Sequence, residues 1–152
     1  AYLKPETKIE LSKVMMLMMT ISDNTGSLWL QRIAGTGTTI NKLMDQMGYS
    51  KTRVNSRTPG RETDRSVYGW GQTSPAEMAR IIEDIVGGKI ISLEACDRML
   101  RIMGRQYWDE EGLSSIPPDV YVASKNGAVD ASRSEVMFVM GKHPYIWLNN
   151  SC

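Results

Sequence analysis

The hydrophobic pattern of this chain changes its period at Pro117-Pro118. Before this dipeptide, apolar residues recur at the three- and four-residue spacing of amphipathic helices. After it, they form the shorter runs that are typical of β-strands. A chain of 152 residues can bury one core. The sequence therefore predicts an α/β protein of the α+β type, with a helical region over residues 1–118 and a small antiparallel sheet over residues 119–152.

Local start and stop signals place the helices of the first region. Thr7-Lys8-Ile9-Glu10 has the form of a capping box, and the Met-rich segment after it predicts a buried helix to about Thr20. Ser74-Pro75-Ala76-Glu77 combines a capping Ser, a Pro at the first position and a Glu at the third. Thr38 and Ser92 are the expected caps of two further helices. The pattern predicts helices over residues 7–20, 24–33, 38–47, 74–86 and 92–103.

Residues 51–73 show no sustained period, are rich in Arg and contain Pro59 among several glycines. We expect one long irregular loop here. A loop of this length inside a compact domain is usually functional. The alternative is a solvated excursion that salt bridges hold in place.

Three strands are predicted in the second region, over residues 120–125, 133–140 and 145–148. Residues 136–140 are apolar on both faces, which is typical of a central strand that is covered on both sides. We expect only half of that cover to come from this chain. Apolar surface on the Met-rich helix and on this strand should then be exposed.

Composition and charge exclude several classes of function. A net charge of +1 gives no reason to expect a nucleic-acid partner, and no apolar run is long enough to span a bilayer. The single histidine, His143, lies in a probable surface turn, and with two distant cysteines it excludes a conventional zinc site. We expect no metal and no cofactor. Cys96 reads as a small core residue, and a disulfide between Cys96 and Cys152 stays open.

Two short strings carry the chemical information: Ser22-Asp23-Asn24 and, about a hundred residues later, Lys125-Asn126-Gly127. Each has an ordinary structural explanation, because Ser, Asp and Asn cluster at helix ends and Asn-Gly is a strong hairpin signal. No Ser-x-x-Lys sequence occurs anywhere in the chain.

Together and in this order, the two strings resemble the second and third signature elements of the serine β-lactamases and penicillin-binding proteins. Residues 19–26 are similar to the SDN segment of the class A enzymes, and residues 123–128 to their K-[ST]-G strand. The segment 51–79 resembles the omega loop and the helix after it. The resemblance covers roughly residues 3–148 and implies one incomplete unit of a β-lactamase/transpeptidase-like fold.

The resemblance also implies catalytic roles. Ser22 would relay a proton, since a hydroxyl both donates and accepts, and Lys125 would supply positive potential. The class A enzymes carry a Glu before a Pro in the omega loop, and here Thr58 stands at that position. Thr cannot act as a general base at neutral pH. Glu62, four residues later, could substitute for that Glu, although a salt bridge with Arg61 or Arg65 is the simpler role.

The substrate contacts that the resemblance implies fall on Asn24, Asn126, Gly127, Ala128 and Arg133. Asn24 would bind the substrate amide, and Ala128 would lend a backbone N–H to the oxyanion hole. Arg133 would assist carboxylate binding, or else form a surface ion pair with Asp130 or Glu135. Asn126 departs from the family, which has Ser or Thr at this position.

The leading hypothesis is a fragment of a serine hydrolase that opens β-lactam amides through an acyl-enzyme, with its nucleophile outside this chain. Alone, the chain should be inactive and should pair with the missing N-terminal half or self-associate. A penicillin-binding, peptidase-like enzyme that deacylates poorly is the second hypothesis, and a non-catalytic module that retains the fold is the third. The expected substrate is a small β-lactam or peptidoglycan-like molecule, and the expected location is periplasmic or secreted.

Overall fold

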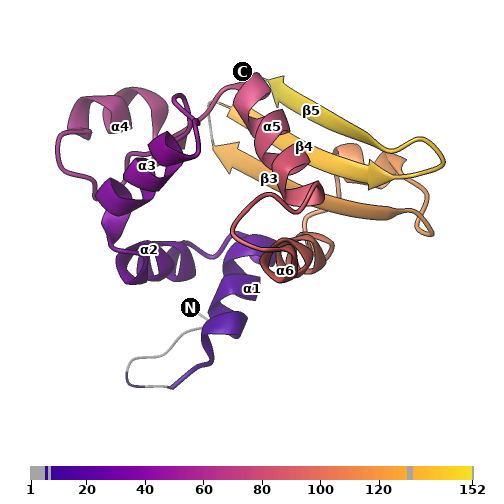
Figure 1. Ribbon diagram of the computed structural model, residues 1–152, viewed down its shortest axis with the longest axis horizontal. Helices are drawn as coiled ribbons and strands as arrows, with labels where there is room; N and C mark the ends of the chain where they lie inside the picture. The colour runs from indigo at the N-terminus through magenta and orange to yellow at the C-terminus, as the bar shows by residue number, and fades with distance from the viewer. Residues whose placement is uncertain (1–5, 7, 130–131, 152) are drawn as a thin grey trace. The chain divides into compact units, whose positions relative to one another are not determined.

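The computed structural model describes residues 6, 8–129 and 132–151. The chain forms two compact units. Unit 2 comprises residues 24–78, and unit 1 comprises the residues before and after them. All helices precede the three-stranded sheet along the chain, so the predicted α+β class is confirmed (Figure 1).

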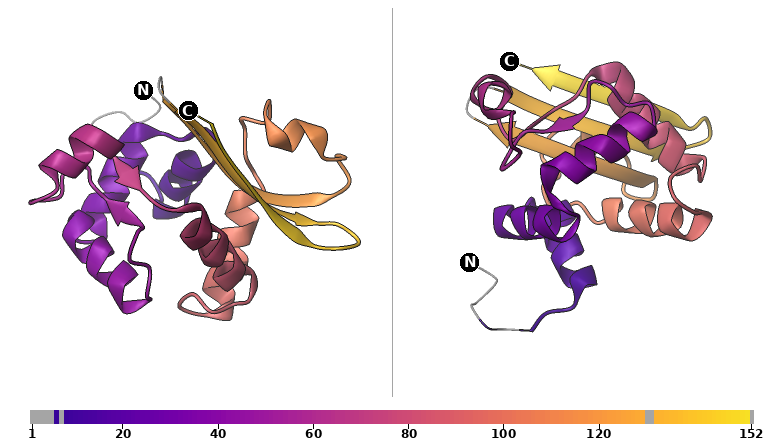
Figure 2. Two further views of the ribbon diagram at one scale, coloured as in Figure 1. Left: turned by 90° about the horizontal axis from the view of Figure 1, so that it is seen from above. Right: turned by 60° about the vertical axis from the view of Figure 1, so that its left-hand side comes forward.

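Unit 1 is a three-stranded antiparallel sheet with helices packed against it. Its elements are α1 (Leu11–Ile21), α6 (Leu93–Met103), η1 (Gly112–Ser115), β3 (Tyr121–Val129), β4 (Ser132–Met140) and β5 (Tyr145–Ser151). The strand order is β3-β4-β5, so β4 is central and β3 has a free edge. Helix α6 contacts both β3 and α1. Figure 2 shows α6 and η1 on opposite faces of the sheet.

The central strand is buried more completely than the sequence predicts. Residues 136–139 of β4 are all less than a tenth exposed. The expectation that this chain covers only half of the strand is therefore wrong, because α6 lies over one face and the segment around η1 lies over the other. The Met-rich helix α1 does expose apolar surface, as expected, because Leu11 and Met16 are nearly half exposed.

Unit 2 contains α2 (Asn24–Ile33), α3 (Thr36–Gln46), β1 (Arg53–Val54), α4 (Glu62–Tyr68) and β2 (Gly71–Gln72). Helix α3 contacts α2 and the short antiparallel ladder of β1 and β2. The segment 51–73 is thus not a loop throughout, because it holds this ladder and a seven-residue helix. Helix α5 (Pro75–Val86) leads from unit 2 into unit 1.

Two predicted helix starts are confirmed and two are wrong. Ser92 accepts a hydrogen bond from the N–H of Ala95, and Ser74 accepts one from the N–H of Glu77. Helix α1 begins at Leu11, with Glu10 at the cap and no side-chain cap bond, while Thr7 lies outside the described residues. Helix α3 begins after Gly35, whose φ of 89° only glycine adopts freely, so the helix starts before the expected cap.

The third signature string does not lie at a strand end. Strand β3 continues through Lys125-Asn126-Gly127 to Val129, so the Asn-Gly pair does not form the hairpin turn. The strand predicted to end at Lys125 is longer because its partner, β4, stays in register as far as Ser132. Among the described residues, no helix is both long and apolar enough to cross a membrane.

Candidate active site

Ser22 is held at the end of α1 in an unusual backbone conformation. Its φ of 55° lies in the left-handed region, which glycine normally occupies at a helix C-terminus. Its backbone N–H and that of Asp23 are both directed to the carbonyl oxygen of Leu17. The turn therefore closes the helix and leaves the Ser22 side chain exposed beyond it.

Lys125 reaches this hydroxyl from the edge strand β3. Its Nζ donates to Ser22 Oγ at 2.5 Å, across 103 positions of sequence, and to the carbonyl oxygen of Asn126 at 2.6 Å. Burial lowers the pKa of the Lys125 ammonium, because a charge in a partly desolvated place loses hydration. No carboxylate of the described chain forms an ion pair with Lys125.

A pocket in unit 1 gathers several of the expected substrate-binding residues. Its lining consists of Ser22, Trp108, Glu110, Glu111, Asn126, Ala128 and Arg133. Asn126 and Ala128 alternate along one face of β3, and Arg133 lies opposite Ala128 on β4. Four residues expected from the sequence thus share one pocket. Gly127 lies between two of them, and a Cβ at its position would come within 3.0 Å of Ser134 Oγ.

The far wall of the pocket comes from residues that sequence reasoning missed. Trp108, Glu110 and Glu111 lie between α6 and η1, in a segment without a motif. The rings of Tyr107 and Trp108 meet edge to face, with centroids 4.9 Å apart. The N–H of Tyr107 donates to the carbonyl oxygen of Thr20 at 3.0 Å, which ties this wall to the last turn of α1.

Glu135 on β4 hydrogen-bonds to the segment that follows this wall. Its side chain is 2% exposed, and its carboxylate accepts from the N–H of Gly112 at 2.8 Å. Burial raises the pKa of Glu135, and the nearby charge of Glu111 acts in the same direction, although the hydrogen bonds from Gly112 and Leu113 oppose this. Asp130, the other expected partner of Arg133, lies outside the described residues.

Unit 2 contains the remaining expected site residues. Asn24 is the exposed first residue of α2. Glu62 is also exposed, at the start of α4, and accepts from the N–H of Gly60 at 3.2 Å. Arg61 pairs with Asp64 at 2.9 Å, and among the described residues Glu62 forms the expected salt bridge with neither Arg61 nor Arg65.

Thr58, which the resemblance aligns with a Glu of the class A enzymes, is buried. It is 6% exposed, and its hydroxyl donates to the carbonyl oxygen of Ser56 at 3.0 Å. A Cβ placed on Gly37 would lie 1.8 Å from its Oγ1, so the two residues pack directly. Gln31 fixes the same segment, since it donates to the Ser56 carbonyl and accepts from Ser56 Oγ at 2.9 Å. The Thr58 side chain therefore serves the packing of unit 2.

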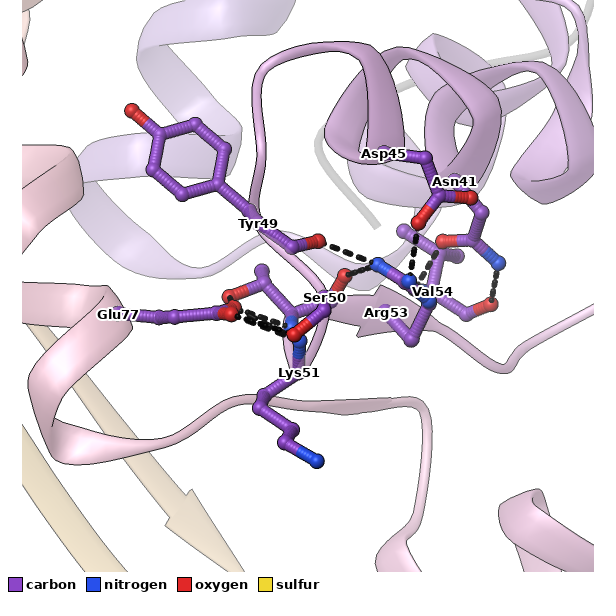
Figure 3. A network of polar contacts seen from close by, with 9 residues as sticks. Asn41, Asp45, Tyr49, Ser50, Lys51, Arg53, Val54 and Glu77 are labelled. Carbon is purple, nitrogen blue, oxygen red and sulfur yellow. Dashed lines mark hydrogen bonds and ion pairs between the residues drawn. The ribbon is translucent and has the colours of Figure 1, made fainter.

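Glu77 holds the start of the long segment (Figure 3). Its carboxylate accepts from the backbone N–H groups of Lys51 and Thr52 at 2.8–2.9 Å, and from the hydroxyls of Thr52 and Ser50. Desolvation alone would raise its pKa, but the hydrogen bonds from Lys51 and Thr52 together lower it to about 2. The Glu at the third position of this predicted helix start thus binds a distant segment.

Metal-ligating residues do not cluster in the described part of the chain: no group of three His, Cys, Asp or Glu could hold an ion. His143 is exposed in the turn between β4 and β5, as expected. Cys96 is a buried free thiol that donates to the carbonyl oxygen of Ile90 at 3.0 Å, and Cys152 lies outside the described residues.

A family model described as "Beta-lactamase enzyme family" matches residues 1–148. Among solved structures, one described as PBP-A is similar at 25% identity and a TM-score of 0.81, over 98% of this chain and 54% of that one. β-Lactamases from Chitinophaga pinensis and Sphaerobacter thermophilus share the fold, with TM-scores of 0.80 and 0.82. Their identities are 20% and 17%; they match 93% and 98% of this chain and 56% of each of theirs.

A second structure of PBP-A is described as an L158E mutant in an acyl-enzyme complex with penicillin G. Its identity to this chain is 25% and its TM-score is 0.80. No curated protein gives a match. The chain spans about half the length of the solved structures that it matches.

Proposed function

Because the chain belongs to the β-lactamase enzyme family, we propose that it forms part of a serine hydrolase that opens β-lactam amides through an acyl-enzyme. The nucleophile comes from a Ser-x-x-Lys segment outside these residues, since none is present among them. These residues alone are inactive in this proposal. The proposal includes a secreted or periplasmic location for the complete protein.

The contact of Lys125 Nζ with Ser22 Oγ carries the proposal. At 2.5 Å the ammonium donates to the hydroxyl oxygen, so the hydroxyl proton is free to point elsewhere. A proton relay needs this arrangement, because the group must donate to the substrate while it accepts from a proton source. The lowered pKa of Lys125 brings its proton closer to transfer at neutral pH.

Substrate binding follows from the pocket. Arg133 supplies the positive charge that a β-lactam carboxylate requires, and Asn126 adds an amide donor. Ala128 contributes its backbone N–H to the oxyanion, and the missing nucleophile supplies the second donor. Trp108 offers an apolar wall to the rest of the ligand.

The test uses the protein that carries this chain together with its Ser-x-x-Lys segment. We expect a covalent penicillin adduct by intact-mass spectrometry and hydrolysis of nitrocefin. Ser22→Ala should lower the acylation rate by about 10²- to 10⁴-fold with the fold retained, the range for loss of a proton-transfer group. A wild-type protein that neither forms the adduct nor hydrolyses nitrocefin would refute the proposal.

Thr58 favours a second candidate, an enzyme that acylates and then deacylates slowly. Its hydroxyl is buried and committed to Ser56, so it offers no base for the deacylating water. In this case, the adduct should persist for minutes or longer after excess penicillin is removed. Rapid turnover without a detectable adduct would reject this candidate and leave the hydrolase.

A further inference from the structure

The wall segment, residues 107–111, builds the far side of the pocket and is attached to the rest of unit 1 at both ends. At the first end, the N–H of Tyr107 donates to the carbonyl oxygen of Thr20 in the last turn of α1. At the second end, the N–H of Gly112 donates to the carboxylate of Glu135 at 2.8 Å. Residues 107–111 are all exposed. The position of the wall segment therefore depends on how firmly its two ends are held.

Glu135 reaches this segment from the face of the sheet that carries the pocket. It lies directly opposite Asn126 in the antiparallel ladder of β3 and β4, and Arg133 lies opposite Ala128 two residues away. Residues that are directly opposite share a face of the sheet, and side chains two positions apart return to it. Asn126, Ala128 and Arg133 line the pocket. Glu135 is thus the buried neighbour of these pocket-lining side chains.

The carboxylate of Glu135 is buried without a cation beside it. No Lys, Arg or His forms an ion pair with Glu135 among the residues that the structure describes. Burial of a charge without a paired cation is unfavourable, and the pKa of Glu135 is raised accordingly. In return, the carboxylate accepts hydrogen bonds from the backbone N–H groups of Gly112 and Leu113 at the start of η1. These groups hold the second end of the wall segment.

Gly112 fits closely between β4 and β5. A Cβ at its position would lie 2.9 Å from Oε2 of Glu135 and 2.8 Å from the ring of Trp147. Both distances are shorter than a van der Waals contact, so a larger residue would displace this backbone from the sheet. The second end of the wall segment therefore has one defined position.

We propose that Glu135 is a positioning residue for the substrate: by holding Gly112, it keeps the wall segment at the distance from β3 and β4 at which the wall contacts a bound ligand. The inference deepens the proposed function and rests on it for the identity of that ligand. Glu135 acts through Gly112, since it is not among the described residues that line the pocket.

This role predicts which kinetic quantity changes. Ser22 and Lys125 are held by α1 and β3, so their contact does not require the wall segment. Wall contacts that are equally strong in the bound substrate and in the transition state affect only substrate binding. Loss of the Glu135 carboxylate should therefore raise the penicillin concentration that gives half-maximal acylation. The acylation rate at saturation should stay nearly unchanged.

The experiment uses the protein that carries this chain together with its Ser-x-x-Lys segment. The acylation rate is measured over a range of penicillin G concentrations. Glu135→Met keeps the approximate length of the side chain and removes both acceptors. We expect the half-saturating concentration to rise about tenfold, as for one lost hydrogen bond, with the maximal rate within about twofold of the wild type. An unchanged half-saturating concentration, or a loss confined to the maximal rate, would overturn the inference.

Two variants separate positioning from a general loss of stability. Glu135→Gln keeps an oxygen that can accept from Gly112, so its half-saturating concentration should lie within about threefold of the wild type. Phe138→Leu is the matched control, because Phe138 is buried on the same strand with its side chain on the opposite face of the sheet, toward α6 (Figure 2). It should lower thermal stability and leave the half-saturating concentration unchanged. Failure of Gln to restore binding, or an equal rise in the control, would contradict the positioning role.

Gly112→Ala tests the same attachment from its other partner and does not depend on the folding of Glu135→Met. The new Cβ would push the backbone of residue 112 away from Glu135 and Trp147, although the carboxylate remains. The half-saturating concentration should rise as in Glu135→Met. No rise in Gly112→Ala would refute the role of this contact.

Hydrogen exchange separates the failure of this inference from the failure of the proposed function, because it needs no substrate. In Glu135→Met, the amides of Gly112 and Leu113 should exchange at least about tenfold faster than in the wild type, measured by NMR on ¹⁵N-labelled protein. Unchanged exchange would overturn the positioning role even if the protein is active. Absence of a penicillin adduct in the wild type would refute the proposed function, and faster exchange would still support the attachment of the wall segment by Glu135.

Discussion

Replacement of Glu77 by Gln should destabilise the protein more than any other exchange of a single carboxylate for an amide in unit 2. The carboxylate accepts from two backbone N–H groups, of Lys51 and Thr52, and from the Thr52 hydroxyl. Gln keeps the shape but removes the charge, and its NH₂ group would face donors. The start of the long segment would then lose its anchor.

The magnitude follows from the pKa of Glu77, which falls from 4.5 to about 2 on folding. A shift of this size corresponds to about 3 kcal/mol of stability if none of it is screened. The side chain is only partly buried, so solvent reduces this figure. We expect Glu77→Gln to lower the free energy of unfolding at pH 7 by about 1–2 kcal/mol.

The sign of the pH dependence is fixed as well. The pKa of Glu77 in the folded state lies below that in the unfolded chain, so the Glu77 carboxylate contributes its full stabilisation above pH 4.5. It is lost as the pH falls toward 2, and less than about half remains at pH 3. The difference in free energy of unfolding between the wild type and Glu77→Gln should therefore become smaller as the pH falls.

Urea unfolding followed by tryptophan fluorescence measures this gap at pH 7 and pH 3. Glu83→Gln, an exposed position on the same helix α5, is the control and should change stability by less than about 0.5 kcal/mol. An equal gap at both pH values would show that the charge of Glu77 is not what holds the segment. A loss no larger than that of the control would refute the reasoning altogether.

Two further changes test the packing of each unit. Gly37→Ala should cost about 1–3 kcal/mol, because the new Cβ would lie 1.8 Å from Thr58 Oγ1; Gly141→Ala, with open space around it, should be nearly neutral in thermal unfolding. Glu135→Ala should cost about 1–3 kcal/mol, since it leaves the part-buried N–H of Gly112 without its acceptor. Glu135→Gln keeps an acceptor for Gly112 and removes a carboxylate whose pKa is raised in the folded state. The wild type should therefore become less stable relative to the Gln variant as the pH rises above 4.5. A constant difference between their free energies of unfolding from about pH 4 to pH 8 would count against this.

Structural features that depend on a few neighbouring residues were predicted well from the sequence. Ser74 and Ser92 cap their helices because each hydroxyl meets an N–H three positions ahead. The strands β3, β4 and β5 follow the expected apolar runs, and only their ends differ. The start of α1 was misplaced, because the helix begins only at Leu11, with Glu10 at its cap and no side-chain cap bond.

Contacts between distant segments were beyond the reach of these signals. Glu77 was singled out only as part of a helix start, yet its carboxylate binds residues 50–52, more than twenty positions earlier. Trp108, Glu110 and Glu111 carry no motif, and only their packing beside β3 and β4 brings them to the pocket.

The sequence alone determined the order of helices and strands, the two signature strings and the absence of Ser-x-x-Lys, because these depend on residue type and short spacing. Tertiary structure decided that Lys125 meets Ser22, and that a loop and two strands build one pocket. Hydrogen bonds reach only about 3 Å, so partners 103 positions apart are chosen by packing of the sheet and helices around them.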